Sequence, residues 1–210
     1  MKSGRLALYA TVLALAVSVS VNGPAEATLA LDLVSPAGPA AAATTSTQGW
    51  AFDVKNSITV GGLGFWDEDS NGLLTSHLVR LWTDAGSLLA SVTIDNGDTP
   101  VASALGAAEG RWLFEAIAPV VLAPGRYVIG ADFDATHIDP DRIDQSFTTI
   151  GDITFIEPRF SNPPGFPGQP AINVAPGIFG PTFSTVPEPA SLALFGIGLA
   201  GLALARRRRN

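Results

Sequence analysis

The strongest pattern for metal chemistry in the chain is an acidic run, DEDSNG, at residues 67–72. Asp67, Asp69 and Asn71 alternate before a glycine, as oxygen ligands do at the start of a calcium-binding loop. The match to an EF-hand ends there, because Leu78 stands where a bidentate Glu is required and the flanks are typical of strands. The run therefore predicts Ca²⁺ as the one candidate cofactor, bound by Asp67, Asp69 and Asn71 with help from other loops. The alternative is a solvated acidic turn, which His77 would orient by hydrogen bonding.

A second acidic segment, DFDATHIDPDRID, covers residues 132–144 and gathers Asp132, Asp134, His137, Asp139, Asp141 and Asp144. Such residues can bind a metal, and two carboxylates can hydrolyse a glycosidic bond. Pro140 and the lack of an apolar rhythm indicate a long loop, where Asp is common. The chain has no Gly-x-Ser-x-Gly nucleophile motif, and GGLG at 61–64 lacks the helix and Lys of a phosphate-binding loop. We therefore predict no catalytic residues, and a secreted hydrolase is the weakest functional hypothesis.

The composition excludes several other chemistries. The 210 residues include no cysteine, which rules out thiol catalysis, iron–sulfur clusters and disulfides, so a hydrophobic core must stabilise the domain. Setting aside residues 1–27 and 186–210 leaves 6 basic and 17 acidic residues, a net charge of −11. A surface this acidic is unsuited to nucleic acid or anionic lipid, since it can neither neutralise phosphates nor be attracted to a negative membrane surface.

The interior of the chain consists of short β-type runs separated by turn residues. The predicted strands are WAFDV (50–54), ITVGGLGFW (58–66), HLVRLWT (77–83), SLLASVTI (87–94), RWLFEAIAPVVL (111–122), GRYVIGADF (125–133) and DITFIEPRF (152–160). The segment Asp84-Ala85-Gly86 is typical of a hairpin connection in which Gly takes a positive φ. This pattern predicts an all-β fold, a single antiparallel β-sandwich or jelly-roll-like domain.

Trp50, Trp66, Trp82 and Trp112 all fall within predicted strands. We expect their large side chains to fill the core between two sheets. The alternative is that some of them form an exposed platform on which sugar rings stack. Exposure of the rings in the folded domain distinguishes the two hypotheses.

The N-terminus has the three parts of a secretory signal. Lys2 and Arg5 precede an apolar stretch from Leu6 to Val21, and Ala25-Glu26-Ala27 supplies the small-x-small pattern that signal peptidase cuts. We expect residues 1–27 to be a signal peptide and the mature chain to begin at Thr28. An uncleaved anchor is the alternative.

The C-terminus is a short apolar stretch followed by a basic cluster. Leu192 to Ala205 would form about 21 Å of helix, against a hydrocarbon core of about 30 Å. The cluster of Arg206, Arg207, Arg208 and Arg209 would stay on the cytoplasmic side. The pattern predicts a short transmembrane helix at 192–205 with a basic stop at 206–209, so the preceding domain would lie outside the inner membrane. A plain C-terminal anchor fits the same physics.

Residues 186–210 resemble the PEP-CTERM sorting signal of Gram-negative bacteria. Pro187, Glu188 and Pro189 form its triplet, and an apolar Gly-containing helix and an arginine cluster follow in order. Both prolines disfavour helix before them, so the triplet should be extended, with Glu188 as a recognition group. The resemblance implies processing by an exosortase, a membrane-embedded enzyme similar to cysteine transpeptidases. It also implies a setting of exopolysaccharide production and biofilm or floc formation.

Residues 48–135 resemble an uncharacterised β-rich domain often carried ahead of such tags, through an acidic Gly turn and the run SHLVRLW at 76–82. That resemblance implies no activity. The expected organisation is a signal peptide at 1–27, an extended lead-in at 28–47, a β-sandwich at 48–160, a Pro/Gly-rich cover and stalk at 161–185, and the sorting signal at 186–210.

We thus expect an exported protein of the cell surface or extracellular matrix, not an enzyme, anchored transiently in the inner membrane. Its expected partners are signal peptidase, an exosortase and exopolysaccharide, and nucleic acid is not among them. A structural or adhesive role is the leading hypothesis, and a carbohydrate-binding module with a structural Ca²⁺ is the alternative.

Overall fold

A computed structural model describes residues 28–34, 39–40, 44–136, 139–143, 146–172, 174 and 176–186. These residues form an all-β fold, which confirms the predicted fold class. Within these ranges there is no helix long and apolar enough to cross a bilayer. The predicted signal peptide at 1–27 and the predicted helix at 192–205 lie outside the described residues.

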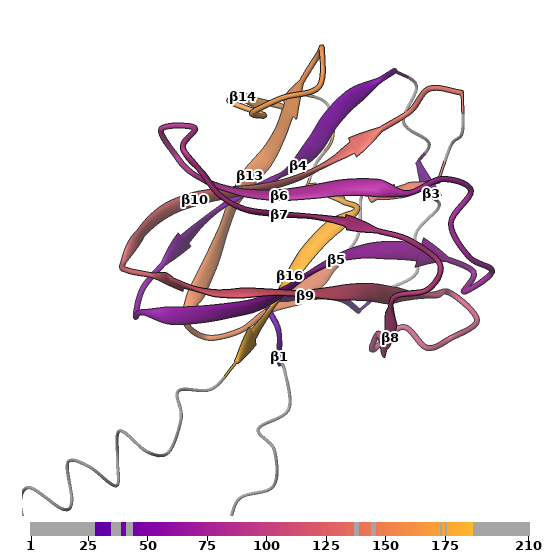
Figure 1. The fold of residues 1–210 in the computed structure, drawn as a ribbon, viewed down its shortest axis with the longest axis horizontal. Helices are drawn as coiled ribbons and strands as arrows, with labels where there is room; N and C mark the ends of the chain where they lie inside the picture. Colours follow the sequence, from indigo (N-terminus) through magenta and orange to yellow (C-terminus); the bar gives the residue numbers. More distant parts are fainter. Residues whose placement is uncertain are drawn as a thin grey trace, which may run out of the picture.

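The larger sheet has six antiparallel strands (Figure 1). Their spatial order is β14 (Gln169–Pro170), β13 (Ile153–Ser161), β4 (Ser46–Val54), β10 (Gly125–Phe133), β6 (His77–Thr83) and β7 (Leu88–Ile94). The alternating side chains of β4 point Trp50, Phe52 and Val54 into the core, as period-2 geometry requires.

The second sheet has five strands and packs across the first. Its order is β1 (Thr28–Leu29), β16 (Pro181–Val186), β5 (Ile58–Glu68), β9 (Gly110–Leu122) and β8 (Thr99–Ala102). Two small sheets complete the fold: β15 (Ile178–Phe179), β11 (Asp141–Ile143) and β3 (Pro39–Ala40) form one, and β12 (Phe147–Thr149) and β2 (Leu31–Leu33) form the other.

Aromatic residues fill the space between the sheets. Trp50 of the six-stranded sheet lies 6.1 Å from Phe183 of the five-stranded sheet, ring centre to ring centre, and the two rings are stacked. Near the small sheets, Phe147 packs on Phe155 and Phe179 at 4.9 Å each. Burial of these rings supplies the stability that a chain without disulfides must obtain from its core.

The predicted strands agree with the observed ones to within a few residues, because the apolar alternation on which they rest is the pattern of a half-buried strand. The hairpin glycine Gly86 has a φ of 85°, as its turn position predicts. The 13-residue β9 is irregular against β5, where the register shifts between Val60 and Gly62.

The sandwich extends beyond the predicted 48–160 at both ends. The segment taken as a lead-in contributes β1 and β2, with Leu31 and Leu33 fully buried. Within the segment predicted as a cover and stalk, Phe166 packs on Trp82 of the six-stranded sheet, as a cover would. The end of that segment forms β16, which lies between β1 and β5 in the five-stranded sheet. Two- and three-residue strands such as β1 and β2 are too short to give a periodic signal, so the sequence pattern missed them.

Gly49→Ala should lower the free energy of unfolding by about 3 kcal/mol or prevent folding. A Cβ at Gly49 would lie 2.0 Å from the carbonyl oxygen of Ile129, a backbone atom that cannot move without breaking the β4–β10 pairing. Gly151→Ala is the matched control, since a Cβ there meets no atom within 4 Å. Denaturant unfolding of both variants measures the difference, and equal stability would contradict the close approach.

Candidate functional site

The acidic turn after β5 is built around Asp67, whose side chain is fully buried. Arg111 Nε donates to Asp67 Oδ2 at 2.8 Å, and the Gly72 amide donates to Oδ1 at 2.9 Å. Asp69 and Ser70 continue the turn with φ values of 58° and 54°. Residues other than Asn, Asp and Gly seldom adopt such positive φ values. One carboxylate oxygen of Asp67 therefore stabilises the turn itself, and the other connects the turn to β9.

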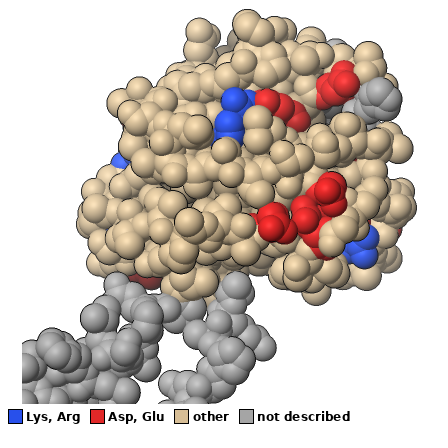
Figure 2. Space-filling view, viewed as in Figure 1, with Lys and Arg blue, Asp and Glu red and all other residues tan. Residues whose placement is uncertain are grey.

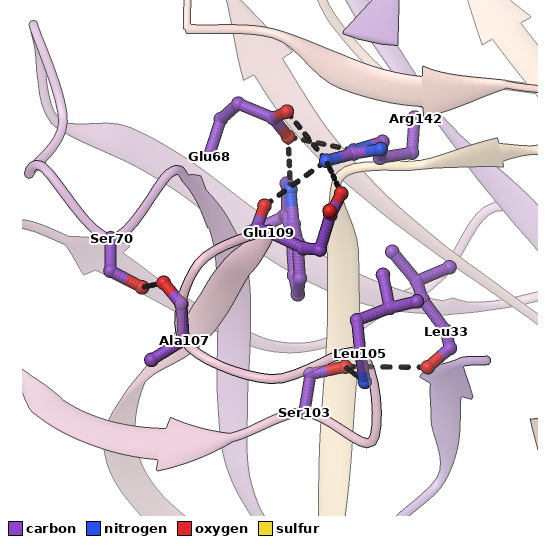
Figure 3. Close-up of polar contacts among 9 residues, drawn as sticks. Leu33, Glu68, Ser70, Ser103, Leu105, Ala107, Glu109 and Arg142 are labelled. Atoms are coloured by element: carbon purple, nitrogen blue, oxygen red, sulfur yellow. Dashed lines mark hydrogen bonds and ion pairs between the residues drawn. The ribbon is translucent and has the colours of Figure 1, made fainter. Parts of the chain in front are cut away.

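Beside this turn, Glu68 accepts two hydrogen bonds from Arg142 of β11, from Nε at 2.7 Å and from Nη2 at 2.6 Å (Figure 3). The Trp66 indole donates to the same carboxylate at 2.6 Å, and the Glu109 carbonyl accepts from Arg142 at 3.0 Å. Arg142 is only 2% exposed, so this fork-shaped pair joins β5 to β11 inside the fold. Sequence reasoning missed it because 74 residues separate the partners.

The structure gives the acidic turn an internal role and leaves calcium binding there a prediction. The side chain of Asp69 is exposed to solvent, whereas that of Asp67 is buried. The two carboxylates therefore lie in different environments. Within the described ranges, no group of three His, Asp or Glu side chains could hold a metal ion. Asn71, the third predicted ligand, is exposed.

Another acidic group was not singled out from the sequence. Glu115 of β9 lies beside Asp98 and Asp95 of the β7–β8 turn, and its pKa is raised because it hydrogen-bonds to Asp98 and meets the charge of both. Cross-strand placement brings these carboxylates together. No local motif would have indicated the group.

His77, at the start of β6, is fully buried and stacks on Phe65 with the ring centres 3.8 Å apart. Its Nδ1 lies 2.8 Å from the Asp132 carbonyl oxygen and its Nε2 lies 2.9 Å from Asp139 Oδ2. Both neighbours are oxygen atoms that can accept a hydrogen bond, so the ring is held from both sides. From the sequence, His77 is predicted to orient the acidic turn by hydrogen bonding. In the structure its hydrogen bonds go instead to Asp132 and to Asp139.

Asp139 connects its own loop to the segment that follows the acidic turn. Its carboxylate accepts from the Leu74 amide at 2.7 Å and from the Thr75 amide at 3.1 Å, in addition to His77. Burial alone would raise the pKa of Asp139, but the hydrogen bonds from His77, Leu74 and Thr75 together lower it. The negative charge of Asp139 is therefore part of the folded structure.

The other described carboxylates of the 132–144 segment are separated by their partners. Asp132 pairs with Arg80, and Thr47 donates to the same oxygen. Asp134 accepts hydrogen bonds from Thr136. Asp141 is 2% exposed, and burial raises its pKa to about 7. His137 and Asp144, predicted members of the same group, lie outside the described residues.

All four tryptophans are buried, with Trp82 the most exposed at 4%. The expectation that they fill the core is confirmed for Trp50, Trp66 and Trp112, whereas Trp82 lies outside that core and packs on Phe166. No pair of Trp rings forms an open platform. Trp50 also donates its indole N–H to the Pro181 carbonyl of the opposite sheet at 2.8 Å. Trp112 donates to Asp32 of β2 at 2.9 Å, so two of the four indoles connect separate sheets.

A hollow of about 350 Å³ lies where the segment after β13 turns back toward β14. It is lined by Phe160, Ser161, Asn162, Phe166, Gly168 and Gln169. Phe166 rests on Trp82 with the ring centres 5.9 Å apart, which holds this wall against the sheet. The lining combines two aromatic rings with two amide side chains and has no charged group.

At the C-terminal end, β16 runs to Val186 and is hydrogen-bonded to β1 and β5. A family model, the PEP-CTERM protein-sorting motif, matches residues 185–209. The motif thus begins inside the strand, at Thr185 and Val186. No curated protein and no solved structure matches the chain.

The chain thus combines an all-β domain with a sorting motif that implies export and cell-surface sorting in Gram-negative bacteria. More particularly, it carries a PEP-CTERM protein-sorting motif, which is consistent with an exosortase substrate. Pro187, Glu188 and Pro189, predicted as its recognition triplet, and the basic cluster Arg206–Arg209 fall within the matched range, although outside the described residues.

Asp141→Asn should raise the free energy of unfolding above pH 7 and leave it nearly unchanged below about pH 4. The pKa of Asp141 is about 7 in the folded protein and 3.8 is the ordinary value, so the folded state holds a proton that the unfolded state releases. That contribution to stability is complete below the lower value and is lost as the pH rises through 7. Urea unfolding at several pH values measures it.

Asp139→Asn is the opposite control. Because the pKa of Asp139 is lowered, its contribution is present at neutral pH and is lost as the pH falls through the folded value. The Asn variant should therefore be destabilised by about 2 kcal/mol or more near pH 7 and by less in acid. The same pH profile for both variants would contradict the assigned environments.

Proposed function

We propose that this exosortase substrate is a structural or adhesive component of the outer surface or extracellular matrix, within exopolysaccharide or biofilm. Signal peptidase would release the N-terminus after Ala27, and the C-terminal helix would hold the chain in the inner membrane until the exosortase acts. The domain itself is the delivered product.

The observation that carries this proposal is the direct junction of domain and motif. Thr185 pairs with Thr28 and with Val60, and Val186 pairs with Thr59. The same two residues open the sorting motif. No linker separates the domain from the sorting motif. Processing near the Pro-Glu-Pro triplet would therefore deliver the folded sandwich with all its strands.

The internal use of polar groups supports a role without catalysis. The groups with the sharpest chemical patterns, Asp67 and His77, bind Arg111 and Asp139 inside the fold. The described carboxylates of the 132–144 segment are divided among separate partners. A hydrolase would need two of them facing one cleft.

Glu188→Ala should keep the protein in the membrane fraction of the producing cell and reduce the amount in the extracellular matrix. Asp69→Ala, an exposed acidic residue outside the motif, is the matched control and should be sorted normally. Fractionation followed by immunoblotting measures both. Normal sorting of the Glu188 variant would exclude its recognition role, and normal biofilm cohesion in a strain without the protein would exclude the matrix role.

The hollow beside β14 favours a second candidate, a carbohydrate-binding module. Sugar rings stack on aromatic faces, and amides supply both donors and acceptors to hydroxyl groups. Phe160 and Phe166 provide the first feature, and Asn162 and Gln169 provide the second. The absence of charge from the lining fits a neutral sugar.

Host exopolysaccharide should raise the thermal midpoint of residues 28–186 if the hollow binds it, because a ligand of the folded state stabilises by mass action. The Asn162→Ala/Gln169→Ala variant should lose the shift, while Asn71→Ala, an exposed amide elsewhere, should keep it.

The same thermal melt with calcium and with chelator tests the acidic turn, where Asp69→Ala should abolish any shift caused by calcium. No polysaccharide shift would leave the matrix role without a sugar site.

A further inference from the structure

The two ends of the described chain leave the sandwich side by side. Thr28 of β1 pairs with Thr185 of β16, and both strands end on the same side of the five-stranded sheet (Figure 1). Across that sheet the neighbours are Thr59 of β5 and Val121 of β9. We call this part of the molecule the tether end, and define it as residues 28–29, 58–62, 116–124 and 184–186.

The tether end carries no charged residue, although the mature chain has a net charge of −11. In β5 the first charged residue is Asp67, and in β9 the acidic Glu115 comes just before residue 116. Figure 2 shows most Asp and Glu of this face at the centre and right of the molecule, with a smaller acidic patch at the lower edge. Just beyond these ranges, the same end of the sandwich has the Arg126–Asp53 ion pair, Lys55 and Asp152, two positive and two negative groups.

The same region exposes apolar side chains. Val121 is 68% exposed, and Ala116, Ala118, Pro119, Ala123 and Pro124 are exposed around it. A strand in contact with water on one face would normally place polar residues there. The segment AIAPVVLAP at 116–124 places none.

The distance to the membrane is limited by the chain that follows. Val186 is six residues before Leu192, where the predicted membrane helix begins, and six extended residues span at most about 22 Å. Val121 is two strands from Val186, about 10 Å across the sheet. While the tail is attached, the tether end must therefore remain close to the lipid headgroups.

We propose that the tether end rests on the lipid bilayer until the tail is removed, with the exposed residues of β9 in the headgroup layer. This inference rests on the proposed transient membrane anchor. Anionic lipid repels an acidic protein, and an end at which charges of both signs balance minimises that repulsion. The pose holds the sorting triplet at the bilayer surface, where a membrane-embedded enzyme acts.

The absence of cysteine allows a direct test. Val121→Cys and, separately, Leu74→Cys are labelled with an environment-sensitive fluorophore in the full chain. The chain is then reconstituted in phosphatidylethanolamine–phosphatidylglycerol vesicles containing a headgroup-quencher lipid. Leu74 is the matched control, since it is also 68% exposed but follows the opposite end of β5, a strand about 33 Å long. Unchanged thermal midpoints confirm that both labelled chains fold.

The expected result is loss of emission and a blue shift at position 121, with no change at position 74. Equal quenching at both positions, quenching at neither, or failure of the chain to float with the vesicles would overturn the proposal. A blue shift at 121 that depends on protein concentration and needs no vesicles would assign the surface to a second copy, and would also overturn it. The system contains no exosortase or exopolysaccharide, so its outcome is separate from that of the sorting and sugar experiments.

Discussion

The fold depends on buried indole rings that both fill the core and connect its sheets. Trp50 packs on Phe183 of the opposite sheet and donates its N–H to the backbone of β16. Trp112 reaches Asp32 of β2, which also accepts from Ser103 and from the Ala104 amide. A buried indole N–H without an acceptor would be costly, so each bond fixes where the partner strand must lie. In a chain without disulfides, these bonds tie the N-terminal and C-terminal strands to the centre.

The same constraint explains why the acidic segments serve the structure. Loops at the far end of β5 contain many backbone amides that no strand satisfies, and carboxylates accept from them. Asp67 binds the Gly72 amide and Asp139 binds two amides of the 73–76 segment. Arg111 and Arg142 then pair with Asp67 and Glu68, and His77 contacts Asp139. Patterns typical of metal or catalytic sites can therefore arise where a long loop is held by internal ion pairs.

The position of β16 links folding to sorting. This strand contributes the fully buried Phe183 to the core and ends where the sorting motif has already begun. Fold and address thus share residues, and the described domain ends directly before the predicted Pro-Glu-Pro triplet. Pairing of β1 with β16 brings the two ends of the described chain to the same end of the sandwich.

The sequence alone determined the all-β class, the long strands, the hairpin turns and the sorting motif, because each rests on local pattern: apolar alternation, Gly and Pro positions, and a contiguous signal. It also indicated that the tryptophans are buried, three of them in the core. Only the tertiary structure decided that residues 28–33 and 178–186 are strands of the domain, because such short strands are specified by their neighbours. The partners of Asp67, Glu68 and Asp139 were likewise decided by strand placement, since a side chain's environment depends on residues dozens of positions away in the chain.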